Sequence, residues 1–317
     1  MEENQGSKLK LKAYIKLVSV ILLWGGVYHV AKYLVSDTDI WTVAFIRFFS
    51  AAIVLLCIYY KRHRRILIVR PRNHWLMLFW IGLIGVFGYT TLFFAAESLI
   101  PANNVAILYA FTPCITVLLS RFFLKQRIST LAYVGIIIAL LGTIVVISLS
   151  ESSCNGKIIC TGLVKNLSLG QILAVLAAIC MCLYNILNKK AVAMNLDPMT
   201  ITTFSSVFGA ILLFFTFWAF GAPAHTLLHK GFAFWIAMFY TSIFATVISY
   251  KWYSEAIRYI GIGQTAVFLN GVPLSTVLIG VVLLGQSVSL GVIIAAIVII
   301  SGVLITNYAV NKQKTIS

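Results

Sequence analysis

Charged residues are scarce in this chain. They make up 10% of the 317 residues, and the acidic ones are the rarest, with 8 Asp and Glu against 24 Lys and Arg. A soluble domain carries roughly a quarter charged residues. Hydrophobic residues reach 61%, which leaves too little polar surface to keep the chain in water. We therefore expect an integral membrane protein.

The sequence also lacks the motifs of enzymatic and ATP-driven chemistry. It holds no phosphate-binding P-loop, no GxSxG nucleophile elbow and no His/Cys cluster with metal-ligand spacing. We therefore expect no enzyme, no cofactor and no metal site. The net charge of +16 does not indicate nucleic-acid binding, because the basic residues form short clusters between apolar runs instead of one basic face.

Long apolar runs predict an all-α protein with ten membrane-spanning helices, since about 20 apolar residues cross the hydrocarbon core. The expected spans are 13–33, 41–60, 74–96, 102–121, 130–149, 169–190, 199–220, 233–256, 264–283 and 289–308. The connections are short, so neighbouring helices run antiparallel. No cleavage site for a signal peptide follows the basic tail from Met1 to Lys12, and we expect the first helix to remain as an anchor.

The distribution of Lys and Arg predicts the orientation in the membrane. With a cytoplasmic N-terminus, 17 of the 24 basic residues fall in inside segments, and the outside segments hold Lys157, Lys165 and Lys230. This bias predicts that both termini are cytoplasmic. A bacterial inner (plasma) membrane is the expected location.

Cysteines fit this topology. Four lie in apolar spans, where Cys behaves as a small hydrophobe. Cys154 and Cys160 lie in the longest expected outside loop, where a disulfide in an oxidising compartment competes with two free thiols in a reducing one.

The chain contains an internal repeat, in which the second half aligns with the first at one constant offset. At that offset Trp75 aligns with Trp235, Pro113 with Pro273, and Gly142 with Gly302, and several other residues match across four consecutive spans. Apolar bias alone would not readily align Trp, Pro and Gly.

An odd number of spans in each repeat gives the second copy the opposite orientation. The expected organisation is therefore a tail at 1–12, a first five-helix repeat at 13–150, an outside loop at 151–168, a second repeat at 169–308 and a tail at 309–317. Inverted repeats of this kind support alternating access in transporters, although some inverted-repeat proteins are channels.

Several stretches resemble the drug/metabolite transporter superfamily, specifically its ten-helix EamA branch. They are Trp24-Gly25-Gly26 with Lys32, Phe45-Ile46-Arg47-Phe48, the stretches ending in Pro113 and Pro273, and the turns Phe123–Ser129 and Leu283–Ser289. The resemblance covers residues 15 to 308. It implies a substrate cavity between the halves, lined by spans 1, 3, 4, 6, 8 and 9, with spans 5 and 10 peripheral and candidates for forming a homodimer. Where the family usually has Glu, this chain has Gln126 and Gln286, which removes two titratable groups.

Charges at membrane depth are costly and usually face a bundle interior or a watery cavity. Arg47 is an anion-attracting or gating cation or, slightly favoured, a structural Arg bonded to helix-end carbonyls. Lys32 is a ligand for a carboxylate or phosphate, or it reaches the interface or pairs with a nearby acid. His29 is a candidate for proton coupling, but a hydrogen-bonded structural role is favoured.

The two acids of the expected spans are Glu97 and Glu255. Glu255 follows Lys251 by four residues, a spacing that predicts an ion pair on one helical face. Glu97 has no such local partner. It is the better candidate for binding an ammonium group or a proton, although a solvated position near the interface is the alternative.

Aromatic and amide side chains complete the candidate site. Tyrosines away from span ends need a partner for the hydroxyl, which favours a cavity-facing position, and amides at depth are either interhelical glue or substrate ligands. Pro113 and Pro273 interrupt helical hydrogen bonding at matching depths, which points to the binding region or to simple kinks. The candidate substrate-binding residues are Trp24, Tyr28, His29, Lys32, Tyr89, Phe93, Glu97, Tyr109, Tyr184, Asn185, Asn188, Tyr253 and Asn270.

These features predict a secondary transporter or facilitator for a small organic metabolite, amino-acid-like or related, acting by export or exchange. Nucleotide-type and sulfonium metabolites or drugs are alternative substrates. A non-transporting membrane scaffold and a passive channel are the alternatives from other classes. The expected partners are the solute, the lipid bilayer and a second copy of the chain.

Overall fold

The computed structural model describes residues 2–64, 71–124, 129–150, 168–260, 268–269 and 271–316. All regular structure in these ranges is helical, which confirms the expected all-α class. Gln126, Asn270, Cys154 and Cys160 lie outside the described residues, as does most of the expected loop at 151–168.

The first half of the chain forms a series of helices joined by short turns. They are α1 (Glu2–Asp37), α2 (Ile40–His63), α3 (Arg72–Ile81), the π-helical η1 (Gly82–Gly88), α4 (Tyr89–Leu99), α5 (Ala102–Tyr109), α6 (Thr112–Leu124) and α7 (Thr130–Ser150). α3, η1 and α4 follow one another without a break and form one continuous helical segment. Asp39 explains the tight turn before α2, because its carboxylate caps that helix at the amide of Thr42.

The second half is also a series of helices with one π-helical segment. Its helices are α8 (Leu169–Ala193), α9 (Pro198–Phe220), the short α10 (Ala224–Leu228), α11 (Phe232–Phe239), the π-helical η3 (Tyr240–Ile248), α12 (Ser249–Ile260), α14 (Gly271–Leu284) and α15 (Leu290–Ile316). Ser168 and Gln171 form a capping box at the start of α8. Asp197 caps the start of α9, with its carboxylate accepting from the amide of Thr200, and Pro198 follows at the first helical position.

Seven helical stretches of the described chain are long and apolar enough to cross a membrane. They are Leu11–Asp37, Ile40–Arg62, Arg72–Leu99, Ala102–Leu119, Leu169–Ala193, Pro198–Phe220 and Phe232–Tyr253. Shorter apolar helices cover Thr130–Val145, Gly271–Leu284 and Ile293–Thr306, in the regions of the expected fifth, ninth and tenth spans. The chain is thus a multi-pass integral membrane protein, and the count of ten spans stays a prediction.

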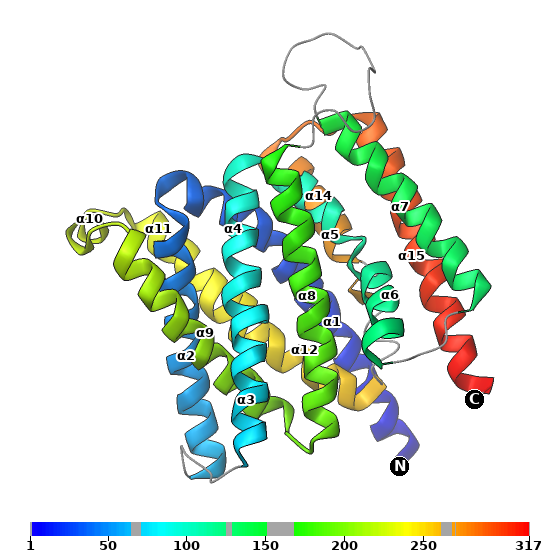
Figure 1. Cartoon of the computed structure of the whole chain (residues 1–317), viewed down its shortest axis with the longest axis horizontal. Helices are drawn as coiled ribbons and strands as arrows, with labels where there is room; N and C mark the ends of the chain where they lie inside the picture. The colour runs from blue at the N-terminus through cyan, green and yellow to red at the C-terminus, as the bar shows by residue number, and fades with distance from the viewer. Residues whose placement is uncertain are drawn as a thin grey trace.

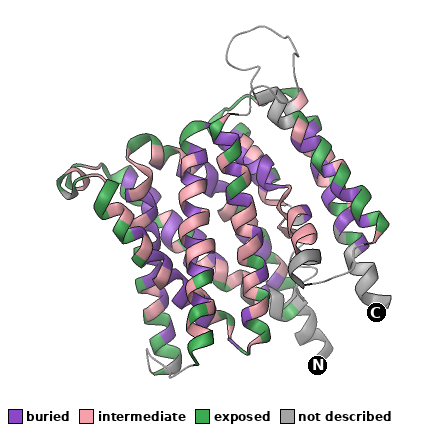
Figure 2. Ribbon diagram, viewed as in Figure 1, coloured by how far each residue is buried: buried purple, intermediate pink, exposed green. Residues whose placement is uncertain are grey.

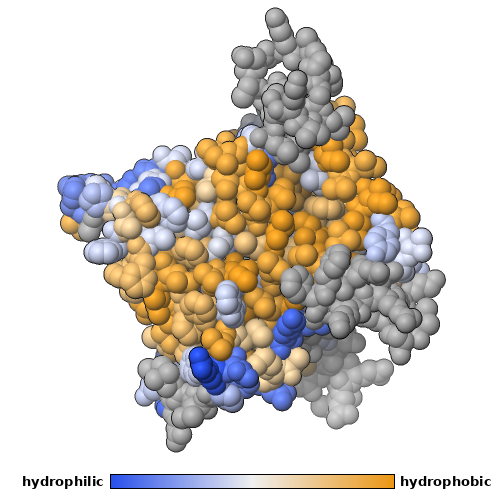
Figure 3. Space-filling view, viewed as in Figure 1, coloured by the Kyte–Doolittle hydropathy of each residue, from blue (hydrophilic) through white to orange (hydrophobic). Residues whose placement is uncertain are grey.

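The helices pack as a bundle with α1 in its interior and the α7–α15 pair side by side at one edge (Figure 1). Buried residues line the faces between helices (Figure 2). Apolar side chains cover the middle of the visible surface, while hydrophilic ones gather near its two ends (Figure 3). Large apolar residues such as Trp218 and Leu283 are exposed, which suits a surface solvated by lipid.

Glycine allows α7 and α15 to approach closely. A Cβ at Gly142 would lie 2.7 Å from the Ile299 side chain, and one at Gly302 would overlap the backbone of Ala139. Small residues at such contacts let membrane helices pack backbone against backbone.

Candidate functional site

Four aromatic rings from three helices meet inside the bundle. Tyr28 of α1 packs edge-on against Phe93 at 5.4 Å and lies 6.1 Å from Tyr109 of α5. Tyr89 of α4 stacks on Phe93 at 5.7 Å and lies 6.0 Å from Tyr109. Phe93 and Tyr109 are 6.1 Å apart. We call Tyr28, Tyr89, Phe93 and Tyr109 the aromatic box.

Glu97 lies one turn beyond Phe93, on the same face of α4. Its exposed fraction is 0%. Neither carboxyl oxygen has a hydrogen-bond partner among the described residues, and the same is true of the Tyr109 hydroxyl. Native proteins pair nearly all buried polar groups, so these orphaned atoms beside the aromatic box mark a place where a ligand or a proton is expected.

Lys32 reaches the end of α4 but does not hydrogen-bond to the Glu97 carboxylate. Its Nζ donates to the main-chain carbonyls of Glu97 at 2.6 Å, Ile100 at 3.1 Å and Ser98 at 3.4 Å. A cation at the C-terminal end of a helix neutralises unpaired carbonyls there. One expectation was that Lys32 pairs with a nearby acid. Among the described residues it instead caps the C-terminal end of α4.

His29, next to the aromatic box in sequence, joins the two halves of the chain. Its Nε2 lies 2.8 Å from the carbonyl oxygen of Thr276 on α14, while its Nδ1 has no partner within the described ranges. Asn103 of α5 donates to the side-chain oxygen of Gln286 at 3.0 Å. Gly280 allows the His29 and Asn103 side chains to lie close to α14, because a Cβ at position 280 would lie about 3 Å from both of them. Here Gln286, where the family usually has Glu, is a neutral acceptor.

Arg47 is a buried cation on α2. Its guanidinium donates weakly to the hydroxyl of Thr246, at 3.4 and 3.5 Å, and lies over the rings of Phe48 and Phe94 at 5.3 and 5.8 Å. Within the described ranges the Arg47 guanidinium thus contacts a hydroxyl and two rings, and no hydrogen bond to the favoured helix-end carbonyls is found there. Cation–π contacts replace part of the lost hydration.

The π-helical segment η3 supplies one hydrogen-bond acceptor and one donor to α1. Trp24 donates its indole N–H to the carbonyl oxygen of Ala245 at 2.8 Å, and Tyr240 donates to that of Leu23 at 2.7 Å. A π-helix leaves main-chain carbonyls without their usual partner. Trp24 also packs against Tyr250 and Tyr253, each at 5.6 Å.

The candidates on α8, which are Tyr184, Asn185 and Asn188, do not join the aromatic box. Tyr184 on α8 packs in a separate cluster with Trp75 and Phe208, and Asn188 is bonded to its carbonyl oxygen at 2.8 Å. Asn185 is exposed, and its predicted contact with the substrate stays a prediction. Successive helical residues are about 100° apart, which turns Asn185 away from the face that carries Tyr184.

Pro113 and Pro273 stand near helix starts. Pro113 is the second residue of α6, after a two-residue break that follows Tyr109, and Pro273 is the third residue of α14. The missing N–H of proline is tolerated in a first turn. Two side chains donate to main-chain carbonyl oxygens at the break before α6. The Cys182 thiol donates to the carbonyl oxygen of Thr112 at 3.3 Å. The Thr112 hydroxyl donates to the carbonyl oxygen of Tyr109 at 2.6 Å.

Glu255 pairs with Lys16 of α1 and not with Lys251, which is exposed. The prediction of a Lys251–Glu255 ion pair is therefore wrong. The spacing of four residues only makes that pair geometrically available, and a lysine on the neighbouring α1 takes the carboxylate instead. Both partners are about one-third exposed.

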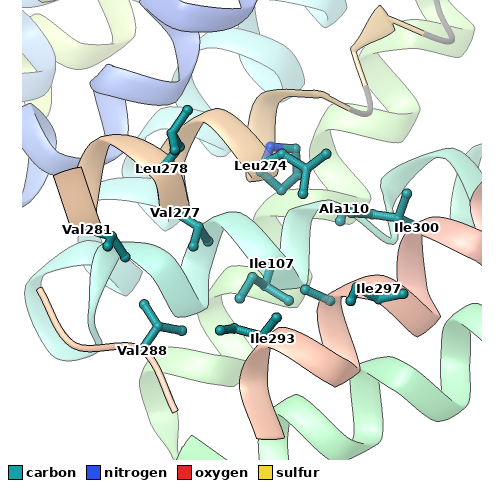
Figure 4. A pocket seen from close by; sticks show the side chains of 12 residues that line it. Ile107, Ala110, Leu274, Val277, Leu278, Val281, Val288, Ile293, Ile297 and Ile300 are labelled. Atoms are coloured by element: carbon teal, nitrogen blue, oxygen red, sulfur yellow. The ribbon is translucent and has the colours of Figure 1, made fainter. Parts of the chain in front are cut away.

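Two apolar grooves lie away from this polar centre. The larger, about 270 Å³, runs between α5, α14 and α15 and is lined by residues such as Ile107, Val277 and Ile297 (Figure 4). The second, about 220 Å³, lies between α2 and α9 around Phe45 and Phe214. Neither is lined by Glu97 or the aromatic box, so both suit lipid chains better than a polar solute.

Sequence reasoning missed several polar partners. Thr246, Thr276 and Asn103 contact Arg47, His29 and Gln286, and no local pattern distinguishes them from other small polar residues in apolar helices. Asn103 had one usable signal, an amide two residues after the Pro101 that starts a span. No group of three or more His, Cys, Asp and Glu in the described parts of the chain is placed to hold a metal.

Comparison with known proteins identifies the family. Residues 11–148 and 168–308 each match the EamA-like transporter family, which confirms the resemblance inferred from the sequence. The protein named Uncharacterized transporter YyaM, from Bacillus subtilis (strain 168), is 28% identical over 306 residues, covering 96% of each chain. Uncharacterized transporter YetK from the same organism is 23% identical over 300 residues, 94% of this chain and 88% of the relative.

A solved structure described as the crystal structure of a protein shares the fold. It superposes with a TM-score of 0.65 at 18% identity, covering 97% of this chain and 99% of the other. At that identity the likeness concerns the fold alone.

Proposed function

Because this chain belongs to the EamA-like transporter family, we propose that it is a secondary transporter or facilitator that moves a small organic metabolite by alternating access. One observation carries the proposal. The Tyr109 hydroxyl and both carboxyl oxygens of Glu97 are buried where α1, α4 and α5 meet. They have no hydrogen-bond partners among the described residues. Polar groups at membrane depth are costly and mark solute pathways.

Alternating access would follow from two five-span halves in opposite orientations, making ten spans in all. The π-helical segments support this, since they end at Gly88 and Ile248, which the internal repeat aligns with each other. The contacts of α1 also support it. Lys32 binds the end of α4, while Lys16 binds Glu255 on α12, the helix equivalent to α4. These lysines are about 24 Å apart along α1, as expected if the equivalent helices run in opposite directions.

The substrate that best suits this centre is amino-acid-like, moved by export or exchange. Arg47 is a buried cation and Glu97 a buried acid on the neighbouring helices α2 and α4, which favours a solute carrying both charges. The scarcity of other buried cations among the described residues disfavours polyanions such as nucleotides. Sulfonium metabolites and drugs remain the second class of substrate.

We place the protein in a bacterial plasma membrane, the inner membrane in a cell with two, with both termini in the cytoplasm. The 17 basic residues on the cytoplasmic side support this orientation. A homodimer would use the exposed apolar faces of α7 and α15 at the edge of the bundle.

Flux into proteoliposomes tests the function. The purified chain is reconstituted and offered a panel of labelled amino acids, amines, sulfonium compounds and nucleotides. Saturable uptake that is accelerated by the same solute trapped inside is the expected result. A channel would instead give unitary currents, because conduction is far faster than conformational turnover. A scaffold would give neither, and then the transport proposal fails.

A further inference from the structure

We propose that Glu97 and the aromatic box form a binding site for an organic ammonium ion, in which one proton leaves Glu97 for each cation bound. This inference rests on the proposed transport function and names the substrate group that the site selects. The burial of Glu97, the lack of partners for its oxygens among the described residues and the four rings beside it support this site.

The carboxyl group of Glu97 is fully buried and lacks any hydrogen-bond partner in the described ranges. An ionised carboxylate in such a place is very unfavourable unless a cation accompanies it. The neutral acid is the stable form of the empty site, and the carboxylate is the stable form when a cation is bound.

Lys32 does not fill the role of that cation. Its ammonium group is already bound by the carbonyl oxygens of Glu97, Ile100 and Ser98. Among the described residues no hydrogen bond joins it to the carboxylate oxygens. Lys32 therefore acts on the Glu97 carboxylate only through space, and an incoming ammonium group would supply the hydrogen-bonded cation that an ionised Glu97 lacks.

The walls of the site suit an organic cation. The four rings contact one another at 5.4–6.1 Å, and faces of aromatic rings attract ammonium groups. The Tyr109 hydroxyl, buried and unpartnered among the described residues, supplies an acceptor for an N–H. The rings pack together here, so this is a closed arrangement that must part to admit a ligand.

Other titratable groups lie on α4 and on the helices near it. α1 contributes Tyr28 and Lys32, α4 itself Tyr89, and α5 Tyr109. α2 and α8 pack against α4 as well, with Arg47 over Phe94 and Cys180 near Tyr109. Glu97 is the acid of this group, so the exchanged proton is assigned to its O–H bond. On binding that bond breaks, the proton passes to water, and the carboxylate pairs with the incoming ammonium ion.

Calorimetry on the purified full-length protein tests the proposal, with n-butylammonium as the probe and n-butanol and butyrate as its neutral and anionic counterparts. Titrations in two buffers of different ionisation enthalpy count the protons released. We expect the ammonium probe alone to bind, about one proton to leave per probe, and the affinity to rise with pH up to about tenfold per unit while Glu97 remains protonated when empty. Equal binding of butanol, or binding without proton release, would overturn the proposal.

Glu97→Gln provides the second arm, with Glu255→Gln as the matched control. We expect the first substitution to weaken probe binding at least tenfold and to abolish its pH dependence, and the control to change neither. Unchanged binding in Glu97→Gln overturns the site. The wild-type proton count decides the matter even if that variant does not fold.

The flux panel separates this inference from the transport function. If the wild-type chain carries an uncharged or anionic solute and Glu97→Gln carries it equally well, transport stands and the ammonium site falls. If n-butylammonium binds with proton release but no solute shows saturable flux, the site stands and the transport proposal falls.

Discussion

α4 and α12 occupy equivalent positions in the two repeats, yet each handles its one acid differently. Glu97 of α4 is fully buried and without a hydrogen-bond partner in the described chain, whereas Glu255 of α12 is one-third exposed and paired with Lys16. In the alignment of the two repeats Glu97 corresponds to Ile257, and Glu255 to Ala95. The two acids are therefore offset by two positions, which is about 200° around a helix, so they point to nearly opposite sides.

This difference shows that the two halves, which match the same family model, differ in their chemistry. The four rings of the aromatic box and the unpaired acid all belong to the first half. The second half contributes main-chain and hydroxyl acceptors, such as the oxygens of Ala245, Thr246 and Thr276. The first half would thus bind the solute, and the second half would bind the helices of the first half that move during transport.

Exchanging the carboxyl group for an amide gives the largest expected effect. Glu97→Gln should lower solute flux in proteoliposomes by about 100-fold, since losing one partner of a buried charge pair costs about 2–5 kcal/mol or more. Glu255→Gln should stay within about threefold of wild type. Equal losses in the two variants would show that the halves do not differ in function.

The two π-helical segments provide the next comparison. Gly85 in η1 corresponds to Ala245 in η3, and a Cβ at Gly85 would overlap the Tyr184 ring. Gly85→Ala should lower the free energy of unfolding by about 1–3 kcal/mol through overpacking. Ala245→Gly should cost roughly 1 kcal/mol through helix propensity. Thermal unfolding in detergent measures both, and a larger loss in Ala245→Gly would contradict the packing at Gly85.

The lysines of α1 give the smallest effect. Lys32→Met removes three bonds to carbonyls at the end of α4 and should cost about 1–2 kcal/mol, in the range of lost helix caps. Lys16→Met removes a partly exposed ion pair, for which about 0–1 kcal/mol is expected. The same unfolding measurement checks the order, and the reverse order would remove the capping role from Lys32.

Much of the fold follows from the sequence because apolar runs, Asp and Ser caps and short turns act locally. The helices containing Trp24, Tyr28, Glu97 and Tyr109 could be placed this way, and the lack of a local partner singled out Glu97. The π-helical segments could not be predicted, because their hydrogen bonds depend on partners such as Trp24, which lies in the opposite half of the chain from η3. The pairing of Glu255 with Lys16 was hidden for the same reason, since it depends on which helix lies alongside α12.

Opposite orientation of the halves is the claim on which the rest depends, and cysteine labelling from one side of the membrane tests it most directly. His229 and Arg62 are exposed residues at the ends of α10 and α2. Single cysteines at these positions, in a chain whose six native cysteines are replaced, are treated in intact cells with a membrane-impermeant maleimide. The account predicts that His229→Cys is labelled from outside and Arg62→Cys only after the membrane is opened. Labelling of both from the same side would contradict it.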